Sequence, residues 1–154
     1  MLTKRLAAAS LAASLSLGAV LVSAFEGVKT KAYLDSVGIA TICYGHTSTV
    51  RMGQTKTIEE CDKLLKEDLL IAAGDVKRLV KVELPAERRA ALISFVFNIG
   101  GEKFASSTVL KKLNSGDASG SCAELSRWVY AGGVKLEGLV SRRAVERELC
   151  EVGL

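Results

Sequence analysis

The stretch "AFEGVKTKAYLDSVGIATICYGHT", residues 24–47, decides how this chain folds. It joins an apolar N-terminal run to a segment rich in β-branched and aromatic residues and punctuated by glycines, a pattern typical of short strands and turns. The residues just before the join, Val22 to Ala24, resemble a signal-peptidase site. Cleavage there would leave Glu26 as the second residue of the mature chain. The fate of the N-terminus therefore determines what surrounds this carboxyl group.

The uncharged run from Leu6 to Phe25 has three possible interpretations. Its first 19 residues would span roughly 28 Å as a helix, about one hydrocarbon core. Seven Ala, four Ser and one Gly make 12 of those 19 residues small, whereas ordinary transmembrane helices rely more on Leu, Ile and Phe. The run is a cleaved signal peptide, a permanent anchor, or a weak anchor that can leave the bilayer. Lys4 and Arg5 before it predict a cytoplasmic N-terminus.

The composition sets broad limits on the class of protein. A length of 154 residues indicates one domain, and a net charge of +4 favours an anionic partner such as a wall polymer, an acidic membrane or nucleic acid. The alternative is a solvated surface with excess lysine. Four cysteines fit two disulfides in an exported chain, with three possible pairings. The absence of a CxxC pair and the single histidine argue against a zinc site.

The order of the expected elements predicts an α+β fold. Residues 32–50 favour short strands, whereas Thr57 and Glu60 form a capping box that opens a long helix. Pro85 suits the first turn of a nearly all-apolar helix that ends at Gly100-Gly101. Shorter helices are expected at 106–114, 117–130 and 141–151. The layout is a small β-containing lobe, a connecting helix and a larger helical lobe, with a cleft between the lobes as the natural ligand site.

Three polar residues, Glu26, Asp35 and Thr41, have a spacing that suits cleavage of a glycosidic bond. If Glu26 ends a helix and the other two lie on a following hairpin, all three can face one cleft. Such cleavage needs one protonated and one ionised carboxyl group. Apolar neighbours would favour protonated Glu26, a polar turn would keep Asp35 ionised, and the Thr41 hydroxyl would hold water. The alternative is three unrelated surface residues.

Several motifs in order resemble the phage lysozyme (muramidase) family. They are the E-x8-D-x5-T pattern, "AALISFVFNIG" (residues 90–100), "RWVYAGG" (127–133) and "GLVSRRAVE" (138–146), and together they cover nearly all of Phe25 to Cys150. The N-terminal run and the cysteine positions are most similar to the signal-anchor-release endolysins of this family. The resemblance implies a lysozyme-like fold and hydrolysis of the β-1,4 bond from N-acetylmuramic acid to N-acetylglucosamine in peptidoglycan.

The resemblance also implies site roles, partners and location. Glu26 is expected as the general acid, and Asp35 and Thr41 as the groups that position water for an inverting reaction. Residues 1–25 are expected to form the signal-anchor-release segment and 26–154 the muramidase domain. Residues 6–25 would hold the domain on the periplasmic face of the host inner membrane until holin-dependent release to the periplasm. The enzyme is expected to be a monomer that needs no metal or organic cofactor and binds no nucleic acid.

The remaining expectations concern ties between segments and rival functions. Disulfides are expected between Cys43 and Cys61 and between Cys122 and Cys150, against the alternative of buried free thiols; relatives often have Gly at position 43. By resemblance, His46 pairs with Asp68, and Arg143 rather than Arg142 reaches Glu26. Trp128 is expected to pack among the helices. The rival functions are a lytic transglycosylase and a non-catalytic, membrane-tethered protein that binds walls or regulates lysis.

Overall fold

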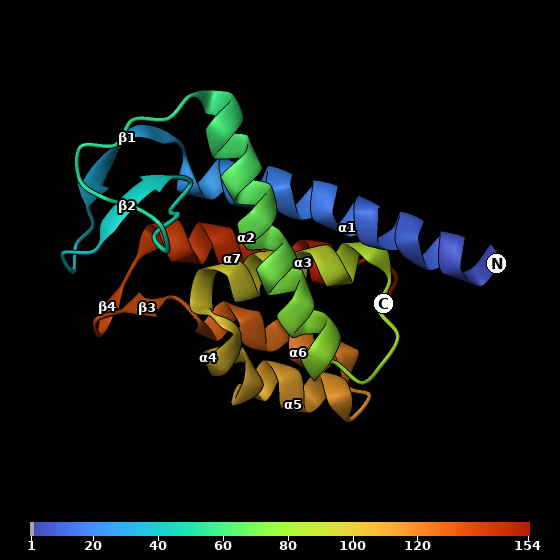
Figure 1. Cartoon of the computed structure of the whole chain (residues 1–154). Coiled ribbons are helices and arrows are strands. Elements are labelled where there is room, and N and C mark those ends of the chain that lie inside the picture. Colours follow the sequence, from blue (N-terminus) through green and yellow to red (C-terminus); the bar gives the residue numbers. More distant parts are fainter. Residues whose placement is uncertain (1) are drawn as a thin grey trace.

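The computed structural model describes the backbone of residues 2–154 and the side chains of residues 10–154. It shows a helix-rich α+β fold with two small antiparallel sheets, β1–β2 and β3–β4 (Figure 1). The elements in chain order are α1 (Leu2–Glu26), β1 (Lys29–Leu34), β2 (Ala40–Cys43), α2 (Ile58–Leu79), α3 (Ala86–Ile99), α4 (Gly101–Ala105), α5 (Thr108–Asn114), α6 (Ala118–Glu124), the 3-10 turn η1 (Leu125–Arg127), β3 (Tyr130–Ala131), β4 (Val134–Lys135) and α7 (Glu137–Cys150). The α+β class predicted from the sequence is confirmed.

The N-terminal run is part of one helix, α1, whose last residue is Glu26. The helix packs mainly along α3 and also contacts α2 and α7. Residues 6–9 of the expected anchor lie outside the described side chains. Among the helices, as far as their residues are described, none contains a stretch long and apolar enough to cross a membrane.

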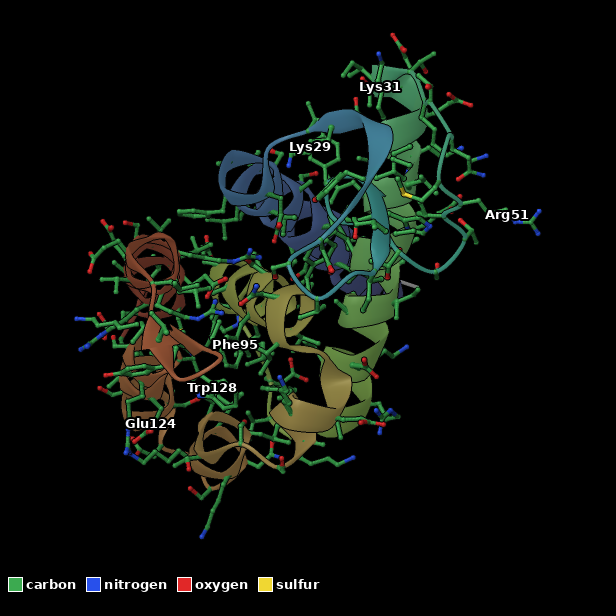
Figure 2. All side chains as sticks on the ribbon, turned by 90° about the vertical axis from the view of Figure 1, so that its left-hand side faces the viewer. Lys29, Lys31, Arg51, Phe95, Glu124 and Trp128 are labelled. Carbon is green, nitrogen blue, oxygen red and sulfur yellow. A yellow bond between two sulfur atoms is a disulfide. The ribbon has the colours of Figure 1, made fainter. Side chains whose placement is uncertain are left out.

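Helix α3 is the centre of the hydrophobic core. Its residues from Ala90 to Val96 are all buried, because α1, α2 and α7 cover it on different sides. Phe95 makes edge-on aromatic contacts with Phe104 and Trp128, as Figure 2 shows for the Trp128 side. The predicted buried central helix is therefore confirmed, and so is the packing of Trp128. Gly100 ends the helix with a φ of 87°, a conformation that glycine adopts without steric cost.

Helix α2 begins as the sequence predicts. The Thr57 hydroxyl oxygen accepts a hydrogen bond from the Glu60 backbone N–H, and the Glu60 carboxylate accepts one from the Thr57 backbone N–H. The helix runs from the β1–β2 end of the molecule to the region of α5 (Figure 1). Lys31 and Arg51 point outward at the β1–β2 end (Figure 2), so part of the positive charge is displayed there, whereas the Lys29 ammonium group lies 4.0 Å from the centre of the Tyr33 ring.

The predicted helix at 117–130 is wrong in its second half. Helix α6 ends at Glu124, η1 follows, and residues 130–135 form the β3–β4 hairpin. Gly132 and Gly133 both have positive φ and make its two-residue turn. The last helix also begins earlier than expected, at Glu137. Pro85 occupies the N-cap of α3 rather than its first turn.

Both expected disulfides are present. Cys43–Cys61 joins the end of β2 to α2, and Cys122–Cys150 joins α6 to α7. The alternative of free thiols is wrong, because all four cysteines are bonded. Cys43 also has a φ of 61°, in the left-handed region that L-residues other than Gly seldom adopt. Glycine would adopt this conformation without steric cost.

The Cys43 conformation leads to a stability prediction. Removing the disulfide as Cys43→Ala/Cys61→Ala should cost roughly 3 kcal/mol, since an 18-residue separation is no longer closed in the unfolded chain. Cys43→Gly/Cys61→Ala also lacks the disulfide, but glycine adopts the positive φ freely. It should be about 1 kcal/mol more stable than the alanine pair. Urea unfolding of both variants measures the difference, and equal stabilities would contradict the assigned backbone cost.

Candidate active site

Glu26 stands at the C-terminal end of α1, next to α7. Its Oε1 accepts a hydrogen bond from Nη1 of Arg142 at 2.6 Å, and the Phe25 ring lies 5.9 Å from the same guanidinium. The side chain of Glu26 keeps 27% of its surface exposed, whereas that of Arg142 keeps 4%. The expectation that apolar neighbours enclose Glu26 is therefore wrong. The carboxylate opens to solvent on one side and is held by a buried cation on the other.

The expectation that Arg143 reaches Glu26 is also wrong. Successive helical residues point about 100° apart, so Arg143 leaves α7 in a different direction from Arg142. Arg143 points toward α3 and η1, where it donates to Asn98 Oδ1 and, at 3.0 Å, to the backbone carbonyl of Trp128. Burial lowers the pKa of Arg143, and the Glu146 carboxylate opposes that shift. The ion pair thus helps keep the buried guanidinium charged.

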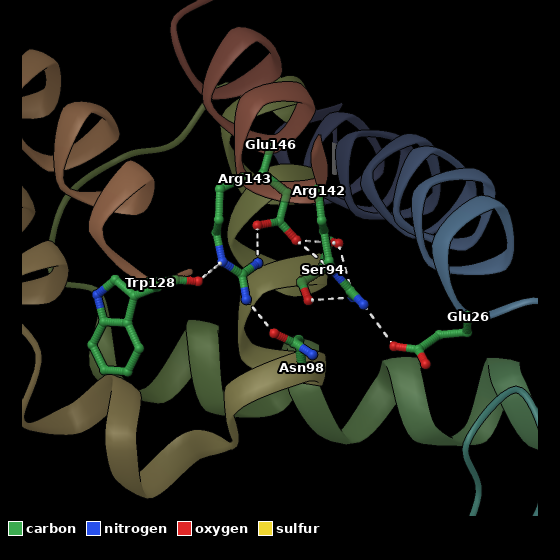
Figure 3. A network of polar contacts seen from close by, with 7 residues as sticks. All are labelled: Glu26, Ser94, Asn98, Trp128, Arg142, Arg143 and Glu146. Atoms are coloured by element: carbon green, nitrogen blue, oxygen red, sulfur yellow. Dashed lines mark hydrogen bonds and ion pairs between the residues drawn. The ribbon is translucent and has the colours of Figure 1, made fainter. Parts of the chain in front are cut away.

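Glu146 is the buried carboxylate that holds both arginines (Figure 3). Its side chain is 0% exposed; Oε1 accepts from Arg142 Nε at 3.0 Å and Oε2 accepts from Arg143 Nη1. The Ser94 hydroxyl donates to Glu146 Oε1 at 2.7 Å, and the Ser94 carbonyl accepts from Arg142 Nη2 at 3.1 Å. Glu146, Arg142 and Glu26 therefore form a continuous chain from the core to the surface.

Sequence reasoning missed Glu146, Ser94 and Asn98. A helical signal existed, because Glu146 follows Arg142 by four residues and Arg143 by three, the spacings at which opposite charges meet on a helix. Ser94 and Asn98 are likewise polar and four residues apart, in a stretch that is otherwise apolar from Ala90 to Ile99. These spacings indicate which residues share a face. They do not indicate which helix lies opposite.

Asp35 and Thr41 lie on one face of the β1–β2 hairpin. Tyr33 pairs with Thr41 and Leu34 with Ala40, so Asp35, two residues after Tyr33, projects to the side of Thr41. Asp35 Oδ1 accepts from the backbone N–H of Val37 and Ile39 at 2.9 and 2.8 Å. The Thr41 hydroxyl donates to the Ile39 carbonyl at 2.9 Å. The polar turn predicted around Asp35 is confirmed.

The turn after β2 brings this hairpin to Glu26. Ile42 and His46 exchange both backbone hydrogen bonds, which closes a tight turn through Gly45. A Cβ placed on Gly45 would lie 3.6 Å from Glu26 Oε2, and the φ of Gly45 is 88°. Glycine is needed here for backbone conformation. The end of α1 thus meets, at Gly45, the turn that follows the strand carrying Thr41.

Three side chains fasten the same turn to α2. Cys43 bonds Cys61, the Tyr44 hydroxyl donates to Asp62 at 2.8 Å, and His46 Nδ1 lies 2.8 Å from Asp68 Oδ2. The expected His46–Asp68 pair is confirmed. The hydrogen bond to Asp62 raises the pKa of Tyr44, so its phenol stays a donor. A pocket of about 270 Å³ opens beside this turn, lined by residues that include Gly45, His46, Asp68 and Phe97.

Breaking the His46–Asp68 contact should loosen the turn. His46 is buried, and its other ring nitrogen already contacts Thr49. Asp68→Ala should therefore lower the free energy of unfolding by about 1.5–3 kcal/mol, the range for hydrogen bonds to charged groups. Urea unfolding checks this value. The neighbouring Glu67→Ala, at an exposed position of the same helix, is the control and should change it little; equal effects would contradict the contact's role.

In the described residues, no group of three or more His, Cys, Asp or Glu side chains is placed to hold a metal ion. The α+β fold, with an acid at the end of its first helix and a polar hairpin beside it, defines a lysozyme-like protein. The chain belongs to the phage lysozyme family, whose model matches residues 23–146. It is therefore a glycoside hydrolase of the lysozyme type.

Similar proteins reinforce the family assignment. The chain is 48% identical to a SAR-endolysin of Bacteriophage PS119 over 81% of this chain and 75% of that one. It is 40% identical to the SAR-endolysin of Enterobacteria phage P21 over 97% and 94%. The muramidase domain of SpmX from Asticaccaulis excentricus superposes with a TM-score of 0.82 at 36% identity, covering 87% of this chain and 94% of that domain.

One solved relative, the P1 phage endolysin Lyz, is known in two forms. The active form matches this chain with a TM-score of 0.78 at 26% identity, over 87% of this chain and 82% of Lyz. The secreted inactive form matches at 0.53 and 25% identity, over 67% and 74%. The arrangement of this chain therefore resembles the active form more closely.

Proposed function

We propose that this chain is an endolysin that hydrolyses the β-1,4 bond between N-acetylmuramic acid and N-acetylglucosamine in peptidoglycan. The family assignment and the 36% identity to a muramidase domain support this substrate and bond. The observation that carries the proposal is the placement of Glu26. It ends α1, is held by Arg142, and faces the turn of the hairpin that carries Asp35 and Thr41.

In the proposed mechanism, protonated Glu26 donates its proton to the leaving glycosidic oxygen. Asp35 and Thr41 hold a water on the opposite face of the sugar, and its oxygen attacks the anomeric carbon as the old bond breaks. The water's proton passes to Asp35, and the configuration inverts. Arg142 stabilises the carboxylate left on Glu26, because its guanidinium is buried and already aligned at 2.6 Å. The pocket beside Gly45 would accept part of the glycan.

The proposed architecture follows the division expected from the sequence. The β1–β2 region forms the small lobe, the helices around α3 form the larger lobe, and α2 connects them. Residues 1–25 are the releasable anchor and residues 26–154 the muramidase domain. The three ties from the β2 turn to α2 support this arrangement, because they attach the small lobe to the connecting helix.

The proposed regulation is release from the host inner membrane. The anchor holds the domain in the periplasm until holin-dependent depolarisation lets the segment leave the bilayer, after which the enzyme works as a monomer. Two observations support this sequence of events. The similarity to the P21 relative includes the N-terminal region, since 97% of this chain is covered. The closer match to the active form of Lyz is consistent with α1 docked on α3 as the released state.

Product analysis of digested peptidoglycan tests the proposed reaction. We expect reducing muramic acid ends whose first-formed anomer is inverted, observed by proton NMR before mutarotation, with one oxygen atom taken from labelled water. A 1,6-anhydro end would identify a lytic transglycosylase instead. Binding to walls with no new ends would identify the non-catalytic alternative.

A further inference from the structure

Helix α1 buries a narrow face of small residues against α3. Ser14 is 0% exposed, Gly18 is also buried, and Val22, one turn further, is 0% exposed. A Cβ added to Gly18 would lie 3.6 Å from an Ile93 methyl and 3.9 Å from the Ala90 carbonyl, so the two helices approach closely there. The four-residue spacing of these positions places them along one side of the helix.

Polar contacts mark the N-terminal end of this face. The Ser14 hydroxyl lies 2.8 Å from the Ser10 carbonyl in its own helix and 3.0 Å from the Ala86 carbonyl at the start of α3. The Ser10 hydroxyl accepts a hydrogen bond from Arg89 Nη1 at 2.8 Å. Arg89 Nη2 donates to the Leu84 carbonyl at 3.0 Å, which holds the guanidinium in place. The N-terminus of α3 thus presents an aligned acceptor and an aligned donor to two serines of α1.

We infer that Ser10, Ser14 and Gly18 form a docking face that sets the register of α1 on α3, and that they are positioning residues for Glu26. The inference rests on the proposed function, in which α1 reaches α3 after leaving the bilayer. Ser14 suits both surroundings, because its hydroxyl can donate to the Ser10 carbonyl in lipid and to Ala86 after docking. The serines therefore do more than weaken the anchor: they specify where it binds.

The register matters because α1 transmits it to the acid. Ser14 precedes Glu26 by 12 residues, roughly 18 Å along the helix. A slip of one residue would shift Glu26 by about 1.5 Å and turn it by about 100°. Catalytic geometry tolerates only about 0.5 Å. Such a slip would break both serine contacts and would also remove Val22 from its buried position.

The chain offers a matched pair of substitutions for a test. Ser14 and Ser16 lie two residues apart in the same helix, but Ser16 is exposed and borders a groove between α1 and α2. Ser14→Leu and Ser16→Leu give segments of identical composition and nearly identical hydrophobicity. Each full-length variant is purified without detergent and assayed on isolated peptidoglycan, so retention in the membrane does not enter the comparison. Hydrogen exchange reports the protection of α1 and of α3 separately.

We expect Ser14→Leu to lower kcat by about 100-fold with KM unchanged and α3 still protected, while α1 loses protection. Ser16→Leu should behave like the unaltered chain. If Ser14→Leu unfolds the whole domain, the smaller substitutions Ser14→Ala and Ser16→Ala provide the test. We then expect a several-fold lower kcat and weaker protection of α1 for Ser14→Ala, and no change for Ser16→Ala. Equal effects of the substitutions at positions 14 and 16, in whichever pair stays folded, would contradict the proposed docking face. An unaltered chain that cuts no peptidoglycan would refute the proposed function, whereas α1 protection would still report docking.

Discussion

Glu26→Gln should abolish wall clearing while leaving the protein folded. Gln is nearly isosteric and can still accept the hydrogen bond from Arg142, but it has no proton to give to the leaving oxygen. General acids contribute about 10²–10⁴-fold to catalysis, and we expect a loss of that size in the rate of reducing-end formation. The melting temperature should change little, because the side chain is partly exposed.

The control for this variant is Glu83→Gln, which makes the same chemical change at an exposed position between α2 and α3. It should retain full activity. If Glu26→Gln still clears walls after normal export and folding, Glu26 is not the general acid. If both variants lose activity, the loss does not report on the acid at all.

The second large effect is expected for stability. Glu146→Gln leaves Arg142 and Arg143, 3% and 1% exposed, without the carboxylate that holds them both. Removing one partner of a buried ion pair costs about 3–5 kcal/mol, because a desolvated charge is left uncompensated. The melting temperature should fall by roughly 6–20 °C. Activity should fall as well, since Arg142 would no longer be aligned on Glu26.

Glu148→Gln provides the matched control, because Glu148 is exposed on the same helix two residues later. Its melting temperature should stay within about 2 °C of that of the unaltered chain, as for most surface substitutions. Calorimetry of both variants measures the difference. A similar, small effect of the two substitutions would contradict the role assigned to the buried carboxylate.

Most of the elements near the site could be predicted because their signals are local. The capping box at Thr57 and Glu60 requires only neighbouring residues, and both hydrogen bonds are present. The nearly all-apolar run of α3 predicts burial on every side, which is observed from Ala90 to Val96. The β3–β4 hairpin was missed because its strands are two residues each and a helical pattern precedes them.

The disulfides and the His46–Asp68 pair required the family resemblance, since spacing alone leaves three pairings open. Even with the family resemblance, the sequence does not predict the correct partner of Glu26. Arg142 and Arg143 are adjacent and chemically identical, and the choice between them depends on how α7 is rotated against α1 and α3. That rotation is set by packing over the whole helix.

The amino-acid order alone thus predicts α2, α3 and the β1–β2 hairpin, because these depend on periodicity, capping and turn chemistry within a few positions. The catalytic roles proposed for Glu26, Asp35 and Thr41 come from their spacing together with the family resemblance. The tertiary structure alone decides that Arg142 holds Glu26 and that Ser14 meets Ala86 across two helices. These contacts join residues up to 116 positions apart. Their formation depends on the relative rotation and translation of packed helices, for which no local signal in the chain exists.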